Sequence, residues 1–265
     1  LLVEMIEPLE GRLYEPCYGT GSFFVSSEKF IDRHAGRRDM LAVYGQERNH
    51  TTYGLARMNL AIRGIFADIR WNSEGTLVRD AFPDERFDYV LANPPFNISD
   101  WSGDKLRDDA RWKYGTPPAG NANFGWIQHM LYHLAPHGTM ATVLANGSLT
   151  STTSGEGDIR KNLIEQDLVE CIVALPPKLF YNTQIPACIW FLSRDKKRTG
   201  EILFIDASDL GTMETRINKV FDQSDLDQIT ETYHAWKTHD NYQDIKGFCK
   251  SATLDEVAKH NYVLT

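Results

Sequence analysis

The feature that most constrains the fold is a regular alternation of two hydrophobic patterns along most of the chain. Short apolar runs rich in β-branched residues alternate with segments in which apolar residues recur every three or four positions. This alternation is typical of βαβ units and predicts an α/β fold with a mainly parallel sheet. Strands are expected near 12–15, 41–47, 75–78, 87–92, 139–145, 169–175, 187–193 and 201–206. Helices are expected near 1–8, 21–34, 50–63, 122–135, 158–166 and 224–236.

The alternation stops near residue 206, and the chain is more polar beyond it. We therefore expect one domain over 1–206 and a truncated helical or irregular appendage over 207–265, without clear strands. The first residues have a helical pattern and no initiator methionine, which suggests an excised fragment.

Composition narrows the class of protein. A net charge of −8 and a pI near 5.5 argue against a chain that grips nucleic acid unaided, so a basic strip or a partner would have to supply that grip. No apolar run approaches the roughly 18 residues that a membrane span needs, so no membrane contact is expected. The four cysteines are scattered without a C-x-x-C pair, which disfavours zinc and fits a reducing, cytoplasmic location.

The most informative motif is Asn93-Pro94-Pro95-Phe96, directly after the apolar run 87–92. A double proline ends a strand because neither residue can donate a hydrogen bond to the ladder. The motif therefore presents an amide and an aromatic ring at the carboxyl end of a strand, where ligands bind in open α/β sheets. A proline-rich loop with a core phenylalanine is the alternative interpretation.

A long connection, 97–121, follows this motif and is rich in aromatic and basic residues, among them Trp101, Arg111 and Trp112. Loops of this length at such an edge are usually functional or disordered. The composition of this one is unlike that of a solvated linker, so we expect it to contribute to a site.

A glycine loop joins the first expected strand to the next helix. Two glycines separated by one residue let the backbone turn sharply and let a ligand approach, and the N–H groups that open the next helix can bind an anion. A tight turn without any ligand gives the same pattern. Phe24 stands where a dinucleotide site needs a third glycine, so a ligand with a carboxylate and an ammonium fits better than a pyrophosphate. The residues expected to bind it are Glu15, which would face the ammonium, Gly19, Thr20, Gly21 and Ser22.

Acidic residues follow the second and third expected strands. Glu47 can accept hydrogen bonds from both hydroxyls of a ribose. Asp80 can accept from an adenine amino group while Ala81 or Phe82 packs against the ring. Singly, the two acids could be a helix-capping residue and a turn residue. Together with the glycine loop and the Asn-Pro-Pro-Phe motif, they fall at the ends of four successive strands and predict a nucleoside with an amino-acid tail, such as S-adenosylmethionine.

At these residues the chain resembles the amino-group DNA methyltransferases, and most of all the modification (M) subunit of type I restriction–modification systems. The resemblance covers nearly all of the chain. It implies a Rossmann-like methyltransferase fold, with a seven-stranded, mostly parallel sheet whose last hairpin, 169–175 with 187–193, supplies one antiparallel strand. It also implies a cofactor-binding segment upstream of residue 1, hence an N-terminally truncated fragment. The other segments that carry it are Gly45-Gln46-Glu47, Asn59-Leu60, 120–124, 126–131, 144–148, Ile159-Arg160, Leu175-Pro176 and 179–186.

The family resemblance implies methyl transfer from S-adenosylmethionine to N6 of an adenine in DNA. The Asn93 amide oxygen and the Pro94 carbonyl would accept hydrogen bonds from the amine, and Pro95 would stiffen the turn. Phe96 would stack on the base, which must be flipped out of the duplex. Phe180 or Tyr181 would close its other face, a core aromatic being the alternative. The implied partners are DNA, a specificity subunit, a second M subunit and an endonuclease subunit.

Other reactive side chains have simpler interpretations. Cys17 lies in the glycine loop, and we interpret it as a residue that packs the loop. This interpretation disfavours cytosine-C5 methylation, because that reaction needs a nucleophilic thiol. His129 and His133 share a helical face, but no third ligand is apparent, so no metal is expected. The basic residues 196–198 are expected to form a solvated turn, and a contact with a phosphate is the alternative. Methylation of RNA or of a protein glutamine, and a non-catalytic cofactor-binding scaffold, remain rival functions.

Overall fold

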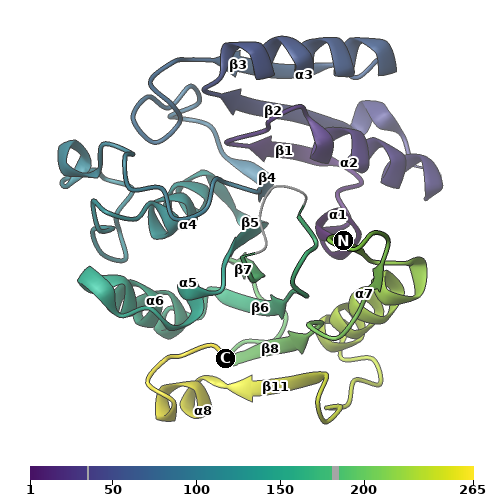
Figure 1. Ribbon diagram of the computed structural model, residues 1–265, viewed down its shortest axis with the longest axis vertical. Helices are drawn as coiled ribbons and strands as arrows, with labels where there is room; N and C mark the ends of the chain where they lie inside the picture. The colour runs from purple at the N-terminus through teal and green to yellow at the C-terminus, as the bar shows by residue number, and fades with distance from the viewer. Residues whose placement is uncertain (35, 181–184) are drawn as a thin grey trace. The chain divides into compact units, whose positions relative to one another are not determined.

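The computed structural model describes residues 1–34, 36–180 and 185–265. The chain divides into two compact units, which are considered separately (Figure 1). The N-terminal unit comprises Leu2–Thr142, and the C-terminal unit comprises Val143–Thr265 together with Leu1.

The N-terminal unit is built on parallel strands. These are β1 (Gly11–Glu15), β2 (Leu41–Glu47), β3 (Ala67–Trp71), β4 (Phe87–Ala92) and β5 (Leu134–Ala145), whose last residues fall beyond the unit boundary. The strand order is β3-β2-β1-β4-β5, and every neighbouring pair is parallel. Parallel pairing brings the carboxyl ends of these strands to one edge, and that edge carries the segments that follow Glu15, Glu47 and Ala92.

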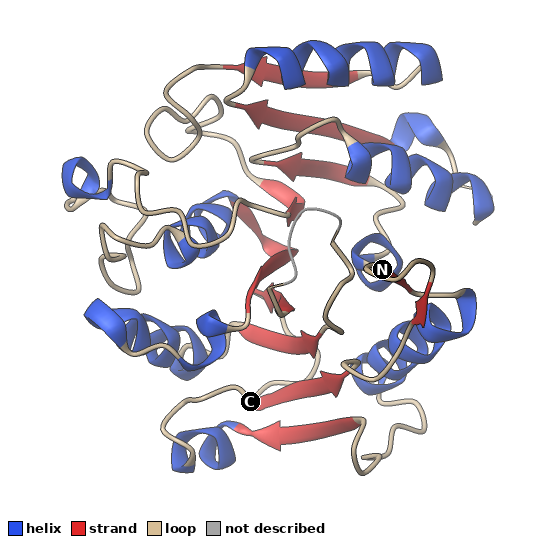
Figure 2. Cartoon of the chain, in the orientation of Figure 1, coloured by secondary structure: helices blue, strands red, loops and turns tan. Residues whose placement is uncertain are grey.

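Helices pack on these strands, and local sequence sets their ends. They are α1 (Leu2–Ile6), α2 (Ser22–Arg33), α3 (His50–Arg63) and α4 (Asn123–His133). The Asn49 side chain caps α3 by accepting from the Thr52 N–H, and Gly64 ends the helix with a left-handed φ of 68°. In Figure 1, α3 lies along β2 and β3. The segment from Asn93 to α4 is mostly irregular, as Figure 2 shows, apart from the short turn η2 (Gly103–Leu106).

The C-terminal unit contains a mixed sheet with the order β7-β6-β8-β11. β6 pairs with β7 in the expected antiparallel hairpin and with β8 in parallel, and β8 pairs antiparallel with β11. The strands are β6 (Val169–Ala174), β7 (Ala187–Ser193), β8 (Glu201–Asp206) and β11 (Cys249–Thr253), and β9 (Thr212–Met213) and β10 (Lys219–Val220) form a separate short pair. The helices are α5 (Gly147–Thr150), α6 (Glu156–Glu165), α7 (Gln223–Thr238) and α8 (Leu254–Lys259). Short 3-10 turns are η1 (Arg38–Met40) and η3 (Thr153–Gly155).

Two predictions about strands were wrong. Residues 75–78 form a turn, because the Arg79 N–H bonds to the Gly75 carbonyl and the Thr76 hydroxyl bonds to the Pro16 carbonyl. The strand in this part of the chain is β3, which was missed because its exposed edge position gives it no apolar alternation. Beyond residue 206, β11 pairs with β8 in register, Cys249 opposite Ile205. Apart from the short β9–β10 pair, the two units contain nine strands in the described residues, whereas the family resemblance predicted seven. The domain boundary predicted at residue 206 remains a prediction.

Two further observations concern the cysteines and the lengths of the helices. All four cysteines are free thiols in the structure. Among the described residues, every helix is too short or too polar to cross a bilayer.

Candidate active site

A pocket of about 500 Å³ opens at the carboxyl edge of the strands in the N-terminal unit. It collects residues that are far apart in the sequence, because each follows the end of a different strand or lies in the long loop. Its walls come from the segments after β1, β2 and β4, from residues 73–78, and from α4. The lining residues are Pro16, Cys17, Glu47, Arg48, Asn49, 73–78, Asn93, Pro95, Ile98, 100–102, Ala122 and Trp126.

The Asn-Pro-Pro-Phe motif lies where the sequence predicted, directly after β4. Asn93 and Pro95 line the pocket and are exposed, Pro94 is buried, and Phe96 is partly buried. The buried proline anchors the turn while the residues on either side of it face the open space. The motif therefore presents an amide to the pocket on a stiff backbone.

A pair of amides holds the end of this motif in place. The Asn97 N–H donates to the Asn123 side-chain oxygen at 3.2 Å, and the Asn123 amide nitrogen donates back to the Asn97 side-chain oxygen at 2.9 Å. The next residues repeat the link, because the Ala122 N–H donates to the Ile98 carbonyl. Asn97 adopts a left-handed φ of 53°, a conformation that asparagine tolerates better than most residues. The start of α4 thus fixes the chain that leaves the motif.

Two carboxylates lie at the acidic side of the site. Glu47 lines the pocket, and its oxygens accept from the Gly19 N–H at 3.0 Å and the Asn49 N–H at 2.8 Å. Glu15 is buried, and its Oε2 has no hydrogen-bond partner among the described residues. Burial, followed by the nearby charge of Glu47, raises the pKa of the Glu15 carboxyl well above its usual value. A cation beside these groups would relieve both effects.

The glycine loop reaches the pocket through Pro16 and Cys17 and adjoins it through Glu47. Its predicted ligand-binding residues Gly19, Thr20, Gly21 and Ser22 do not line the pocket. Gly19 and Gly21 have φ values of 58° and 81°, which only glycine adopts without strain, and a side chain at Gly19 would meet open space. Asn59 holds the loop by donating to the Thr20 carbonyl at 2.8 Å. Ser22 begins α2, whose start has no side-chain cap. Within the loop, the Gly19 and Gly21 N–H groups already donate, to Glu47 and to the Tyr18 carbonyl. The uncapped start of α2 is therefore the part that could meet an acceptor on a ligand.

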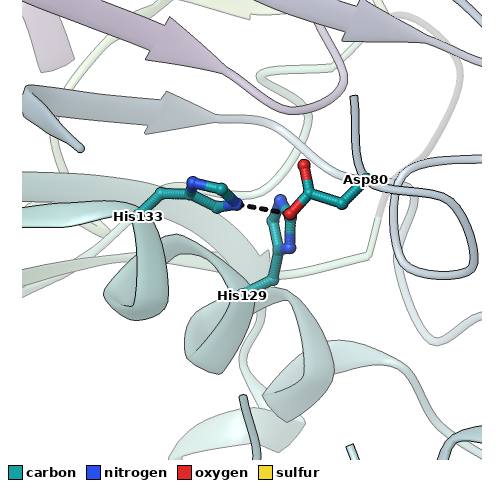
Figure 3. A group of neighbouring side chains, drawn as sticks. All are labelled: Asp80, His129 and His133. Carbon is teal, nitrogen blue, oxygen red and sulfur yellow. Dashed lines mark hydrogen bonds and ion pairs between the residues drawn. The ribbon is translucent and has the colours of Figure 1, made fainter. Parts of the chain in front are cut away.

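Asp80, Ala81 and Phe82 do not line the pocket. Asp80 accepts from the Phe82 N–H at 2.9 Å and bonds to His133 Nε2 at 2.7 Å, as Figure 3 shows for the second contact. The Ala81 N–H bonds to Gln46, and Phe82 is buried among aromatic rings. The predicted contact of these residues with adenine has no support from the lining of the pocket, to which the neighbouring residues 76–78 contribute instead.

Burial raises the pKa of the Asp80 carboxyl, but the His133 hydrogen bond, the charge of the two histidines and the Phe82 N–H outweigh it and lower the pKa to about 2. The carboxylate is thus charged at neutral pH and paired with His133.

The structure supplies the third group that the sequence did not reveal beside the two histidines. Asp80, His129 and His133 place possible ligand atoms within 4.8 Å of one another (Figure 3). Arg111, however, lies 2.9 Å from His129 Nδ1, and because a guanidinium can only donate, this nitrogen accepts. The ring proton then sits on Nε2, which faces the Tyr14 hydroxyl at 3.3 Å. Both nitrogens of His129 are thus engaged, which favours a hydrogen-bonded network over a metal centre.

The aromatic wall of the pocket was predicted only in part, through the expectation that the aromatic loop 97–121 contributes to a site. Trp101 and Trp126 line the pocket and pack in one buried cluster with Leu77, Trp112 and Ala122. The aromatic content of the loop 97–121 was the available signal for Trp101. Nothing local marked Trp126, because its helical position is equally consistent with the core.

Three other predictions have different outcomes. Phe180 belongs to the C-terminal unit and Tyr181 lies outside the described residues, so their contact with a base remains a prediction. Burial, then the charges of Glu15 and Glu47, raises the pKa of the Cys17 thiol, which favours packing over a nucleophilic role. Lys196 is buried and bonded to Asp167 and the Glu201 carbonyl, so it is not placed for a phosphate.

Known proteins resemble the chain along its whole length. A family model described as N-6 DNA Methylase matches residues 1–265. The type I restriction enzyme HindI methylase subunit of Haemophilus influenzae is 53% identical over 265 residues, which are all of this chain and 60% of that protein. The MjaIX methylase subunit of Methanocaldococcus jannaschii is 40% identical over 275 residues, with 100% of this chain and 49% of that protein covered. The chain thus spans about half to three-fifths of the length of these relatives.

A solved structure supports the same assignment. The type I restriction–modification methyltransferase subunit of Streptococcus thermophilus matches with a TM-score of 0.87 and 29% identity, over 99% of this chain and 56% of that one. The fold is accordingly the Rossmann-like α/β fold of S-adenosylmethionine-dependent methyltransferases, as predicted. The family model covers the whole chain, and the chain therefore belongs to the N-6 DNA methylase family.

Proposed function

We propose that this chain carries the catalytic site of a modification subunit that transfers a methyl group from S-adenosylmethionine to N6 of a flipped adenine in DNA. The observation that carries the proposal is the meeting of Asn93 and Pro95 with Glu47 around one pocket. An amide acceptor for an amine and an acidic acceptor for a ribose are what this reaction requires on its two sides.

The residues present fit the cofactor. The buried Glu15 oxygen without a partner among the described residues suits an ammonium group, whose charge would offset the burial and the Glu47 charge that raise the pKa of this carboxyl. Glu47 would accept from ribose hydroxyls, and the start of α2 after Gly21 would face a carboxylate. When bound, S-adenosylmethionine supplies a methyl group activated by its sulfonium. Residues 76–78, with Trp101 and Trp126, would enclose its apolar part.

Asn93 and Pro94 would hold the acceptor nitrogen. The lone pair of an exocyclic amine is delocalised into the adenine ring, so the amine needs orientation more than it needs a base. The Asn93 side-chain oxygen and the Pro94 carbonyl would accept its two hydrogens and aim the nitrogen at the methyl group. Pro95 and the Asn97–Asn123 pair would keep these acceptors still. Phe96, with Phe180 or Tyr181, would stack on the flipped base.

Partners follow from charge and from the relatives. The net charge of −8 leaves little long-range attraction for DNA, so another subunit would provide most of the grip. The curated relatives are named as methylase subunits of type I restriction enzymes. We propose that a specificity subunit reads the DNA sequence, with a second M subunit and an endonuclease subunit in the same complex.

Replacing Asn93 tests the proposal. In the complete gene product with its partners, Asn93→Ala should lower methyl transfer to DNA at least about 100-fold, as loss of a positioned transition-state contact does. Cofactor affinity, measured by calorimetry, should stay within a few-fold because Asn93 is on the acceptor side. Asn162→Ala, an exposed asparagine of α6, is the matched control and should leave both unchanged. Unchanged turnover in Asn93→Ala, or transfer only to RNA or to protein glutamine, would contradict the proposed function.

A further inference from the structure

Trp126 lies in the first turn of α4 and lines the pocket. Its side chain is buried, and its indole N–H has no hydrogen-bond partner among the described residues. A buried donor without an acceptor costs about 1–3 kcal/mol, and native structures rarely leave one in this state. The atom therefore calls for a partner that the protein part of the site does not supply.

The other two tryptophans of the same aromatic cluster sharpen this observation. Trp101 donates from its indole nitrogen to the Pro118 carbonyl at 3.3 Å, and Trp112 donates to the Leu106 carbonyl at 2.5 Å. All three indoles are buried in one cluster, yet only the one in α4 lacks an acceptor within the described residues. Burial of an indole alone does not explain the difference, since the fold satisfies the N–H groups of its neighbours.

The surroundings of Trp126 limit where an acceptor can come from. The ring packs against apolar members of the cluster and lies edge to face with His129, whose two nitrogens already face Arg111 and Tyr14. The pocket that the ring lines is the open side. An indole can only donate, so the group that enters must offer a lone pair.

We infer that the Trp126 indole N–H donates a hydrogen bond to a ring nitrogen of an adenine bound in the pocket, and that Trp126 is a specificity-determining residue. The inference rests on the proposed function, because that function brings adenine rings to this pocket. A flat, apolar ring with nitrogen lone pairs at its edge matches a wall of tryptophans that carries one unused donor. The adenine of the cofactor and the target adenine share this chemistry, so the experiment has an arm for each.

The experiment combines a change in the protein with a change in the ligand. Trp126→Phe keeps an aromatic ring and removes the donor. Calorimetry would measure the affinity of the wild-type protein and of this variant for S-adenosylhomocysteine and for its 1-deaza, 3-deaza and 7-deaza analogues. In the second arm, binding of DNA that carries each deaza-adenine at the target position would be measured for both proteins. The complete gene product with its partner subunits is used throughout.

We expect one deaza substitution, in one arm, to weaken binding to the wild-type protein about 10-fold, which corresponds to about 1.4 kcal/mol. The same substitution should make no difference to Trp126→Phe, because the donor is already absent. The arm in which this coupling appears identifies the adenine concerned. Trp112→Phe removes a satisfied indole N–H from the same cluster, so it should show no such coupling.

Equal losses in the wild type and Trp126→Phe for every deaza analogue, in both arms, would overturn the inference. Failure of the proposed function has a different signature, because the wild-type complex would then either not bind S-adenosylhomocysteine or bind it without methylating DNA. A melting curve of Trp126→Phe like that of the wild type would show that any change in affinity does not come from unfolding.

Discussion

Two groups of buried polar atoms in the N-terminal unit differ in how completely they are satisfied. Behind the pocket, Arg111 donates to Asp109, to the Leu77 carbonyl at 2.5 Å and to His129, while His133 joins Asp80 to the Glu85 carbonyl. At the pocket, Trp126 keeps a buried polar atom without a partner among the described residues, and so does Glu15, which directly precedes the lining residue Pro16. The first group is complete within the protein, and the second is not.

This difference separates scaffold from site. A satisfied network fixes the segments it joins, and here Arg111 ties the long loop to α4 and to the Leu77 backbone of the pocket wall. An unsatisfied group is a cost to the free protein that a ligand can remove. Changes in the network should therefore lower stability, whereas changes at the pocket should lower affinity with little effect on folding.

The largest expected effect is that of Arg111→Met. Loss of the guanidinium leaves the partly buried Asp109, the buried His129 and the Leu77 carbonyl without their donor, which should lower the free energy of unfolding by about 3–5 kcal/mol. Denaturant unfolding would measure it. Arg107→Met, at an exposed position in the same loop, is the control and should change stability by less than about 0.5 kcal/mol. Similar values for the two variants would remove the distinction between network and surface.

Acid should weaken the same network. Asp80 has a folded-state pKa of about 2, below the ordinary 3.8, so the stability it contributes is present above pH 3.8 and is lost as the pH falls toward about 2. The contribution is about 2 kcal/mol. Unfolding free energies measured across this range should fall more steeply for the wild type than for Asp80→Asn, and parallel curves would argue against the Asp80–His133 pair.

At the pocket the expected effect is smaller and of another kind. Glu15→Gln removes a charge that an ammonium would need, so affinity for S-adenosylhomocysteine should fall about 10-fold, or about 1.4 kcal/mol. Stability should not fall with it. Because the folded-state pKa of Glu15 is raised, ionisation in the unfolded chain lowers stability as the pH rises above the ordinary glutamate pKa, and glutamine abolishes that loss. A large drop in melting temperature in Glu15→Gln would contradict the assignment.

The smallest expected effect is that of Asn123→Ala. It removes the amide pair that holds Asn97 after the Asn-Pro-Pro-Phe motif but touches neither expected ligand. Methyl transfer should slow several-fold while cofactor affinity stays the same, as steady-state kinetics and calorimetry can show. Equal loss in the two measurements would point to general distortion of the pocket.

Local sequence predicted those parts of the molecule that local forces determine. The bounds of α3 agree with its predicted range because a capping asparagine and a terminal glycine mark both ends. The strand predicted over 75–78 was wrong, because contacts with distant residues, such as the Thr76 hydrogen bond to the Pro16 carbonyl, determine the conformation of this segment. Asp80 and His133 pair although 53 positions separate them in the sequence. The Trp126 N–H stands out only because no acceptor among the described residues lies beside it. No sequence pattern reports either.

The most direct test of the account is the number of protons released when S-adenosylhomocysteine binds. It is measured by calorimetry at mildly acidic pH in buffers of different ionisation enthalpy. Burial raises the pKa of the Glu15 carboxyl in the free protein, and an arriving ammonium should lower that pKa and so favour loss of the proton. We expect the wild type to release protons on binding and Glu15→Gln to release none. Equal proton release in the two proteins, with similar affinity, would show that the unmatched carboxyl is not where the ligand binds.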